Sequence, residues 1–192
     1  MSSGQRPKHE IRSSHTKGNR FARTMWGVVW LLFFRTSPRP FHYWRNWLLR
    51  LFGADLHPSA RVYPRARVWL PANLSMGAHA CIGDDVEVYC VEKISVGTCS
   101  IVSQHSYLCG ASHDFEDIKH PLIPAPISIG EHCWLAADVF VGPGVTIADG
   151  TVVGARSSVF KDLPSWKVAT GSPATVVRDR KLGPDDLRGT SE

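Results

Sequence analysis

The sequence predicts an all-β fold, a parallel β-helix of hexapeptide repeats, on the basis of two observations. An aliphatic residue recurs at every sixth position from Val96 to Leu108, and after an interruption the same six-residue spacing resumes at Ile129 and runs to Val159. Glycine often follows this aliphatic residue, as at Gly97 and Gly130. Self-similarity at a hexapeptide period is typical of a parallel β-helix, and chance spacing of unrelated short strands does not account for it.

Each repeat is expected to form a short strand and a turn, so that three repeats close a triangular coil of about eighteen residues. The leading aliphatic side chain points inward and stacks on its equivalents in neighbouring coils, which hydrogen-bond about 4.8 Å apart. The second residue is small because the backbone turns there and a side chain would crowd it. The in-phase aliphatic positions are Val96, Val102, Leu108, Ile129, Leu135, Val141, Ile147, Val153 and Val159.

The composition agrees with one soluble domain that carries a basic appendage. The chain has 192 residues, of which 43% are hydrophobic and 20% are charged. Its net charge of +5 is unevenly spread, because residues 1–50 hold ten Lys and Arg against one acid while the remainder is mildly acidic. The basicity therefore belongs to the N-terminal part and gives no reason to expect nucleic-acid binding.

The cysteine content and the apolar runs indicate the compartment. The five cysteines are odd in number and include no Cys-x-x-Cys pair, which favours reduced thiols used as small apolar side chains. The polar first twenty residues contain no secretory signal. The best apolar run, residues 26–34, is nine residues long, whereas a transmembrane helix needs about twenty. These features predict a cytoplasmic protein.

Two regions are predicted before the repeats: a disordered basic arm at residues 1–20 and an aromatic helical segment at residues 21–54. Pro38 and Pro40 divide the second region into two helices, because proline does not continue a helix. One interpretation is a helical cap over the open end of the solenoid. Another is a basic, aromatic face at residues 21–52 that contacts the inner membrane surface peripherally, and the two interpretations are compatible.

The β-helix is predicted over residues 55–165, followed by a C-terminal cap and tail at residues 166–192. A loop at residues 114–126 interrupts the repeat directly after His113, where a repeat ends. Insertions in solenoids form loops on one face, which is often the binding face. In the first part of the β-helix the phase slips by two residues on two occasions; its aliphatic positions are Leu56, Val62, Val68, Leu74, Ile82, Val88 and Ile94.

Several short motifs accompany the repeats. The most specific is Ser112-His113-Asp114, which is followed by the loop and then by the segments at residues 161–164 and 171–174. With these motifs the chain resembles the left-handed β-helix hexapeptide acyltransferases over roughly residues 21–180, especially the WcaF-like O-acetyltransferases of colanic acid and other exopolysaccharide biosynthesis. The other matching motifs are residues 44–45 with 51–54, Ser103-Gln104 leading to residues 107–109, Trp134, and residues 143–147.

The resemblance implies a left-handed coil, although parallel crossovers are right-handed in about 98% of cases. It also implies a homotrimer with active sites between neighbouring prisms. The implied reaction moves an acetyl group from acetyl-CoA, without a metal, to a hydroxyl of a sugar or lipid-linked glycan in polysaccharide biosynthesis.

His113 matches the family's catalytic position, which makes it the candidate general base. An alcohol is a poor nucleophile at neutral pH, and a histidine can take its proton as the oxygen attacks the thioester. The partner that orients the imidazole stays open, since Asp114, Glu116 and Asp117 are all near in sequence. The Asn that can hold the imidazole in relatives aligns with Cys90.

Further roles follow from the resemblance. The turn at Ala136 and Ala137 is implied to lie where the thioester binds, and its backbone N–H groups would serve the oxyanion. Thr175 stands at a position that is often Lys in relatives. The residues implied to contact acetyl-CoA are Ala137, Ala155, Phe160, Lys161 and Arg178. The residues implied to contact the acceptor substrate are Trp134 and Asp114.

Two alternatives stay open and a third is disfavoured. An N-acyltransferase acting on an amino sugar also needs a base, and a non-catalytic β-helix scaffold would share the repeats. A zinc-dependent β-helix enzyme needs convergent histidines, two of them five positions apart. The candidates His105, His113, His120 and His132 include no pair at that spacing.

Overall fold

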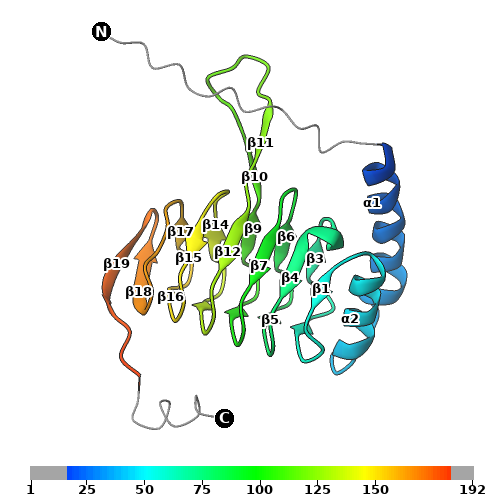
Figure 1. Ribbon diagram of the computed structural model, residues 1–192, viewed down its shortest axis with the longest axis horizontal. Coiled ribbons are helices and arrows are strands. Elements are labelled where there is room, and N and C mark those ends of the chain that lie inside the picture. Colours follow the sequence, from blue (N-terminus) through cyan, green and yellow to red (C-terminus); the bar gives the residue numbers. More distant parts are fainter. Residues whose placement is uncertain (1–16, 183–192) are drawn as a thin grey trace.

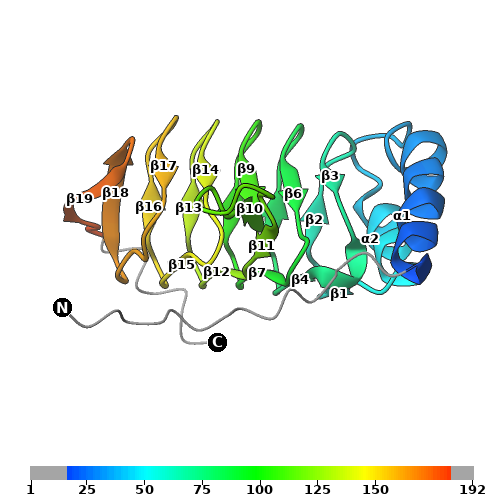
Figure 2. The ribbon, with the colours of Figure 1, turned by 90° about the horizontal axis from the view of Figure 1, so that it is seen from above.

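The computed structural model describes residues 17–182 and confirms the parallel β-helix. Short parallel strands stack into a three-sided prism, with helices at one end and an antiparallel strand pair at the other (Figures 1 and 2). A two-stranded hairpin projects from the side of the prism near its middle (Figure 1). None of the helices within residues 17–182 combines the length and apolar character that crossing a membrane requires.

The three faces of the prism are named here by their strands. Face 1 consists of β1 (Asp55–Leu56), β4 (Leu74–Met76), β7 (Ile94–Val96), β12 (Ile127–Ile129) and β15 (Thr146–Ile147). Face 2 consists of β2 (Arg61–Val62), β5 (Cys81–Ile82), β8 (Ile101–Val102), β13 (Trp134–Leu135), β16 (Val152–Val153), β18 (Lys167–Gly171) and β19 (Ala174–Asp179). Face 3 consists of β3 (Arg67–Val68), β6 (Glu87–Tyr89), β9 (Tyr107–Cys109), β14 (Phe140–Val141) and β17 (Ser158–Val159).

The in-phase aliphatic residues form the core, as the repeat predicts, and all of them are buried. The coil length of eighteen residues is correct only for the second half of the prism, where Ile129 pairs with Ile147. In the first half the coil has twenty residues, because Leu56 pairs with Met76 and Met76 with Val96. The three-residue strand β4 turns both Leu74 and Met76 inward, which is the period of two expected along a strand. This extra inward residue is the reason for the phase slip.

Glycine after the aliphatic residue has the steric role that the repeat predicts. A Cβ atom on Gly97 would lie 2.4 Å from the carbonyl oxygen of Gly130, and one on Gly130 would lie 2.2 Å from Asp149 Oδ1. The coils therefore approach each other too closely at this corner for any side chain.

The predicted loop at residues 114–126 needs correction, because much of it belongs to a β-hairpin. Strand β10 (Ala111–His113) pairs antiparallel with β11 (Leu122–Pro124), and His113 pairs with Leu122. The repeat therefore ends at Gly110, and His113 does not end a repeat. The chain leaves the prism before it reaches His113, and His113 is the last residue of the hairpin's first strand.

The N-terminal region forms α1 (Lys17–Val29), the π-helical turn η1 (Trp30–Phe34) and α2 (His42–Leu51). The first helix begins four residues earlier than expected, so residues 17–20 are helical and not disordered; the rest of the predicted arm, residues 1–16, lies outside the described residues. Figure 1 shows both helices at the same end of the prism. A 3₁₀ turn, η2 (Pro71–Asn73), precedes β4.

Arg45 of α2 is the largest fully buried side chain among the described residues and joins the helices to the first coil. Its Nε donates to Val62 O at 2.7 Å, and Nη1 donates to Pro38 O at 2.8 Å and to Ser37 Oγ at 2.8 Å. Its Nη2 donates to Arg39 O at 2.6 Å. One guanidinium thereby holds both the turn between the helices and strand β2.

His42 predicts an acid-sensitive contribution to stability. Burial lowers the pKa of His42 below its ordinary value of 6.5, and the charges of Arg45 and Arg61 lower it further, while the contact with Val62 O opposes this shift. Below pH 6.5 the unfolded chain therefore binds a proton at His42 that the folded protein excludes until its lower pKa is reached. We expect thermal stability to fall as the pH decreases through this window, and to fall less in His42→Gln. Equal losses in the two proteins, measured by calorimetry between neutral and acidic pH, would contradict this assignment.

The far end of the prism is closed by β18 and β19, which pair antiparallel through a turn with a cis Ser172–Pro173 bond. Residues 183–192 of the expected tail lie outside the described residues. Leu163 forms an isolated bridge with Ile147 and ends the stack on face 1.

Candidate active site

The hairpin of β10 and β11 leaves the prism at the corner between face 3 and face 1, after β9 and before β12. His113 lies on it with an exposed side chain. Its Nδ1 lies 2.5 Å from the carbonyl oxygen of His120, on the opposite side of the hairpin. A carbonyl oxygen can only accept, so Nδ1 carries the hydrogen and donates it. In the neutral ring Nε2 is then unprotonated and has a free lone pair, as a general base requires.

The carbonyl of His120 is therefore the group that orients the imidazole of His113. His120 has a φ of +44°, a left-handed conformation that is uncommon for a residue other than glycine. This conformation occurs where the chain turns back into β11, and His120 N donates to Asp117 O at 2.8 Å. The turn at the tip thus determines which ring nitrogen of His113 is available.

The acidic side chains of the hairpin tip make local turn contacts. Asp114 Oδ1 accepts from the backbone N–H of Glu116 at 3.0 Å, and Asp117 Oδ1 accepts from that of Lys119 at 2.9 Å. Such contacts shape a turn. Asp114 directly follows His113 in the chain, so its place beside the candidate base is compatible with the predicted contact to the acceptor.

The side chain of Cys90 lies in the core of the prism. It is fully buried, and its Sγ donates to Leu70 O at 3.2 Å. Burial raises the pKa of the Cys90 thiol to about 11, so the thiol stays neutral. It fills the core between two coils and does not replace the Asn of the relatives as a partner of His113. All five cysteines are free thiols, and Cys90 and Cys133 are the buried ones.

Trp134 and Ala137 lie on a different side of the prism from the hairpin. Trp134 is 48% exposed on β13 of face 2, and its Nε1 donates to Ser103 Oγ at 3.1 Å. Ala137 lies in the turn after β13, at the corner between faces 2 and 3. The neighbouring Ala136 N–H already donates to Val153 O at 2.9 Å, so it is used within the coil and does not serve an oxyanion as the resemblance implies.

The other candidates for acetyl-CoA contact are distributed over two corners and the end of the prism. Ala155 lies one coil beyond Ala137 at the same corner, and Arg156 N donates to Ala137 O at 3.0 Å. Phe160 and Lys161 follow β17 at the corner between faces 3 and 1, which is also the corner that carries the hairpin. Phe160 and Lys161 are both exposed.

Arg178 and Arg180 differ in the hydrogen bonds that their side chains make within the chain. Arg178, on β19, is exposed and donates from Nη1 to Asp179 O at 3.0 Å. Arg180 donates from Nη1 to His132 O and to Gly150 O at 2.7 and 2.8 Å. Arg180 therefore has a structural role at the end of the prism, whereas the remaining donors of Arg178 face outward.

Within one chain the predicted residues form two separate groups. His113, Phe160 and Lys161 share the corner between faces 3 and 1, whereas Ala137 and Ala155 share the corner between faces 2 and 3. The width of face 3 lies between the two groups. Among residues 17–182, no three His, Cys, Asp or Glu side chains gather closely enough to hold a metal ion.

Sequence reasoning did not identify the carbonyl of His120 as the partner of His113. Every residue has a carbonyl, so no residue type signals this role. Only a prediction that residues 111–124 form an antiparallel hairpin could have indicated this role, because the hairpin brings His113 and His120 together across its turn.

The comparisons with known proteins agree with the fold. The family model described as bacterial transferase hexapeptide (six repeats) matches residues 126–161. The putative colanic acid biosynthesis acetyltransferase WcaF of Escherichia coli is 48% identical over 163 residues, which cover 85% of this chain and 90% of that protein. The galactoside O-acetyltransferase of Escherichia coli is 48% identical over 141 residues, covering 70% of this chain and 68% of that protein.

Solved structures share the fold over most of its length. A hexapeptide-repeat acetyltransferase of Vibrio cholerae in complex with acetyl coenzyme A superposes with a TM-score of 0.78 at 26% identity, covering 88% of this chain and 93% of that chain.

Proposed function

The chain belongs to the hexapeptide-repeat acetyltransferases, and from this premise we propose that it transfers an acetyl group from acetyl-CoA to a hydroxyl of a sugar in polysaccharide biosynthesis. The observation that carries the proposal is the hydrogen bond between His113 Nδ1 and His120 O, which leaves Nε2 as a base. The similarity to a colanic acid biosynthesis acetyltransferase and a galactoside O-acetyltransferase supports a sugar hydroxyl as the acceptor.

In the proposed mechanism His113 Nε2 takes the proton of the acceptor hydroxyl while the oxygen attacks the thioester carbonyl carbon. The carbon–sulfur bond of the tetrahedral intermediate then breaks. The leaving CoA thiolate takes the proton back from Nε2, so His113 ends the cycle neutral. The carbonyl of His120 holds the ring in one tautomer throughout and also stabilises the charged imidazolium, because Nδ1–H remains its donor.

The donor acetyl-CoA is proposed to bind along a groove between two prisms, with Ala137, Ala155, Phe160 and Lys161 beside the pantetheine. Arg178 would meet the nucleotide phosphates, which a guanidinium binds well. The acetyl coenzyme A complex of the Vibrio cholerae relative supports this donor. Trp134 and Asp114 are the proposed contacts to the acceptor.

A homotrimer would complete this site. One chain carries its candidate residues at two corners, and a neighbouring prism would bring the second corner opposite the first. The hairpin tip also exposes Phe115 and Ile118, with 84% and 92% of their surfaces accessible. Large apolar side chains this exposed on a projecting hairpin are expected to be covered by another copy.

Peripheral contact with the inner membrane surface is proposed for residues 21–52, which would bring the enzyme to a lipid-linked acceptor. Four exposed apolar residues of α1 and η1 recur at intervals of four, three and four, so they form one stripe, and α2 presents a second stripe. The segment contains no acidic residue. A basic helical surface with aromatic and aliphatic stripes is typical of binding in the membrane interface. The stripes consist of Phe21, Met25, Val28 and Leu32, and of Tyr43, Trp47 and Leu51.

The membrane contact predicts a loss of vesicle binding when the stripes become polar. Phe21 and Leu51 are 70% and 65% exposed, so Phe21→Ser with Leu51→Ser should leave the fold intact. We expect the double variant to bind vesicles of phosphatidylcholine and phosphatidylglycerol about tenfold or more weakly in co-sedimentation, because two large apolar groups no longer enter the interface. Val177→Ser is the matched control, since Val177 is exposed at the opposite end of the prism. Equal binding by the wild type and the double variant would refute the contact.

The transfer itself is tested by the release of free CoA thiol from acetyl-CoA in the presence of sugars and lipid-linked oligosaccharides, with CoA binding measured by calorimetry. Turnover with a hydroxyl acceptor that lacks an amine supports the proposal. A protein that does not bind CoA would refute it, and turnover confined to amino sugars would replace O-acetyl by N-acetyl transfer.

A further inference from the structure

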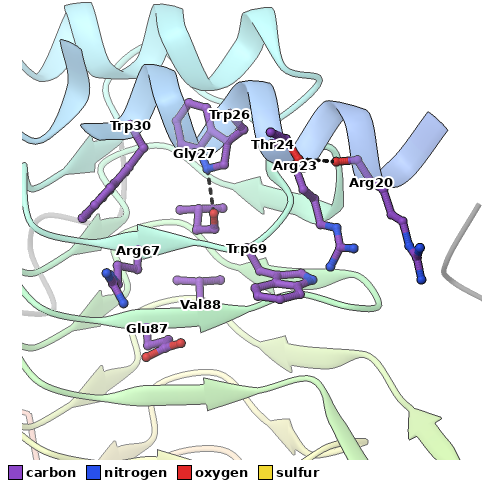
Figure 3. A pocket seen from close by; sticks show the side chains of 11 residues that line it. Arg20, Arg23, Thr24, Trp26, Gly27, Trp30, Arg67, Trp69, Glu87 and Val88 are labelled. Atoms are coloured by element: carbon purple, nitrogen blue, oxygen red, sulfur yellow. Dashed lines mark hydrogen bonds between the residues drawn. The ribbon is translucent and has the colours of Figure 1, made fainter. Parts of the chain in front are cut away.

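A cavity of about 520 Å³ lies between α1 and the first two strands of face 3, away from the catalytic hairpin (Figure 3). This volume is within the range of ligand sites in proteins. Trp26 Nε1 donates to Val68 O at 2.7 Å and Trp30 Nε1 donates to Ala66 O at 2.8 Å. These bonds fix α1 and η1 against the exposed edge of β3. The cavity is therefore a formed pocket between two firmly joined elements.

The charged groups that line this pocket are mainly basic. Arg20 and Arg23 reach it from α1 and Arg67 from β3, against the single carboxylate of Glu87 on β6 (Figure 3). None of these three arginines has an ion pair among the described residues. Asp85 lines a neighbouring hollow together with Arg67 and Glu87, but it pairs with Arg65 at 2.8 Å. The pocket therefore has an excess of positive charge that no carboxylate of the described chain neutralises.

The guanidinium of Arg23 is fixed in position but has an unused hydrogen-bond donor. Its guanidinium carbon lies 4.7 Å from the ring centroid of Trp69, so the group is stacked on the indole. Its Nε is buried and has no hydrogen-bond partner among residues 17–182. A buried donor without a partner is costly, and a bound acceptor would remove that cost. On the other side of the pocket the guanidinium carbon of Arg67 lies 5.1 Å from the centroid of Trp30. Each guanidinium is thus oriented by an indole.

The shape and composition of the pocket point to a phosphate group that is attached to a larger molecule. Guanidinium groups match the geometry of phosphate oxygens, and two or more of them suit a diphosphate. The floor is apolar, with Trp26, Val68 and Val88. The pocket side of α1 also adjoins the exposed apolar stripe, because Arg20 is followed by Phe21 and Thr24 by Met25. A ligand with its phosphate in the pocket could extend an apolar chain along that stripe.

An aromatic ladder runs from the pocket toward the catalytic hairpin. The centroid of Trp69 lies 5.0 Å from that of Tyr89, and Tyr89 lies 6.4 Å from Tyr107. Tyr107 begins β9, which leads into the hairpin strand that ends at His113. Strands β3, β6 and β9 are successive neighbours on face 3, so the pocket strands lie roughly 5 and 10 Å from β9. A sugar joined to the bound phosphate would therefore extend along the ladder on the face from which the hairpin leaves.

We propose that this pocket binds the phosphate or diphosphate group of a lipid-linked sugar, with Arg23 and Arg67 as its ligands, and thereby positions the acceptor. The role of this binding, to position an acceptor, rests on the proposed acetyl transfer. The binding of the diphosphate itself requires no acetyl-CoA. Soluble diphosphates share the chemistry of the ligand, whereas the apolar stripe beside the pocket favours the lipid-linked form.

The test is binding of the whole protein to phosphatidylcholine vesicles that contain a polyprenyl diphosphate, compared with vesicles in which phosphatidylglycerol supplies the same surface charge. Inorganic pyrophosphate and a nucleotide diphosphate sugar are titrated separately in solution. We expect the wild type to prefer the polyprenyl diphosphate vesicles about tenfold or more. Arg23→Gln and Arg67→Gln should each reduce this preference by about tenfold, because each removes a charge-assisted contact. Glu87→Gln should increase it by a few-fold, since it removes the one opposing charge.

Arg61→Gln is the matched control, because Arg61 is exposed on face 2 and does not line the pocket; it should change binding less than about twofold. If Arg23→Gln does not fold, as its melting temperature would reveal, Arg20→Gln tests the same pocket through an exposed side chain. Equal losses in Arg61→Gln and Arg23→Gln, or no preference over phosphatidylglycerol, would overturn the proposal. So would pyrophosphate or the nucleotide sugar binding as tightly as the lipid. Because the assay contains no acetyl-CoA, diphosphate binding without acetyl transfer would refute only the proposed function.

Discussion

Replacing His113 with alanine is expected to reduce the rate of acetyl transfer by roughly 10²–10⁴-fold, the usual contribution of a positioned general base. The reason is that no other unprotonated nitrogen would lie where His120 O holds the imidazole. The binding of CoA, measured by calorimetry, should remain close to that of the wild type, because the ring acts on the acceptor hydroxyl. The measurement is the release of CoA thiol at saturating acetyl-CoA with the best acceptor.

His57→Ala provides the matched control for this experiment. His57 is also exposed, but it lies in the first coil and its Nδ1 contacts only Ser59 Oγ and the backbone N–H of Ser59 among the described residues. Its replacement should leave turnover within about twofold of the wild type. If His113→Ala retained wild-type turnover, a different group would have to be the base. If it lost CoA binding and turnover together, His113 would be part of the donor site.

Replacing Arg45 with alanine is expected to lower the free energy of unfolding by about 3–5 kcal/mol. The carbonyl oxygens of Val62, Pro38 and Arg39 would lose their guanidinium donor; the bond to Val62 O is buried and the other two are partly buried. A hydrogen bond from a charged donor contributes about 1.5–3 kcal/mol where it is buried and less where water can replace the donor. The cavity left by the side chain adds to this loss. For a chain of this length the melting temperature should fall by roughly 10–15 °C, as measured by calorimetry at fixed protein concentration.

Arg50→Ala separates the loss of this network from the general loss of a helix arginine. Arg50 is exposed on the same helix and donates from Nε and Nη2 to a single carbonyl, that of Leu56. We expect its replacement to cost only about 1 kcal/mol. Similar destabilisation by the two substitutions would mean that the buried guanidinium does not join the cap to the prism as its hydrogen bonds indicate.

His113→Ala and Arg45→Ala test two different parts of the protein, the proposed active site and the helical cap. His113 lies on a hairpin that projects from the stack, where its loss need not disturb the core. Arg45 lies where the stack would otherwise end with exposed strand edges, and its contacts hold the helical cap there. The prism can therefore expose the proposed catalytic side chain, because its stability is supplied by the coils and their cap.

The sequence by itself predicted the β-helix and its core, because each coil repeats the same local rule. An inward aliphatic residue such as Val102 or Leu135 recurs at the period of one strand and one turn, and both are buried. The hexapeptide pattern did not predict the twenty-residue coils. In these coils Leu74 and Met76 both face inward on one strand, whereas a strict hexapeptide has one inward residue per strand. The role of general base was assigned to His113 because the residues around it resemble the family motif, and this role stays a prediction.

Only the tertiary structure decided which groups meet across long separations in the chain. The carbonyl of His120 reaches His113 because the hairpin reverses the chain, and a backbone carbonyl has no signature in the sequence. Arg23 and Trp69 stack because α1 packs on the edge of face 3, although 46 positions separate them. A short period can be read from the residues alone because it repeats a local geometry. A pocket between a helix and a distant strand cannot, because it depends on how those two elements pack.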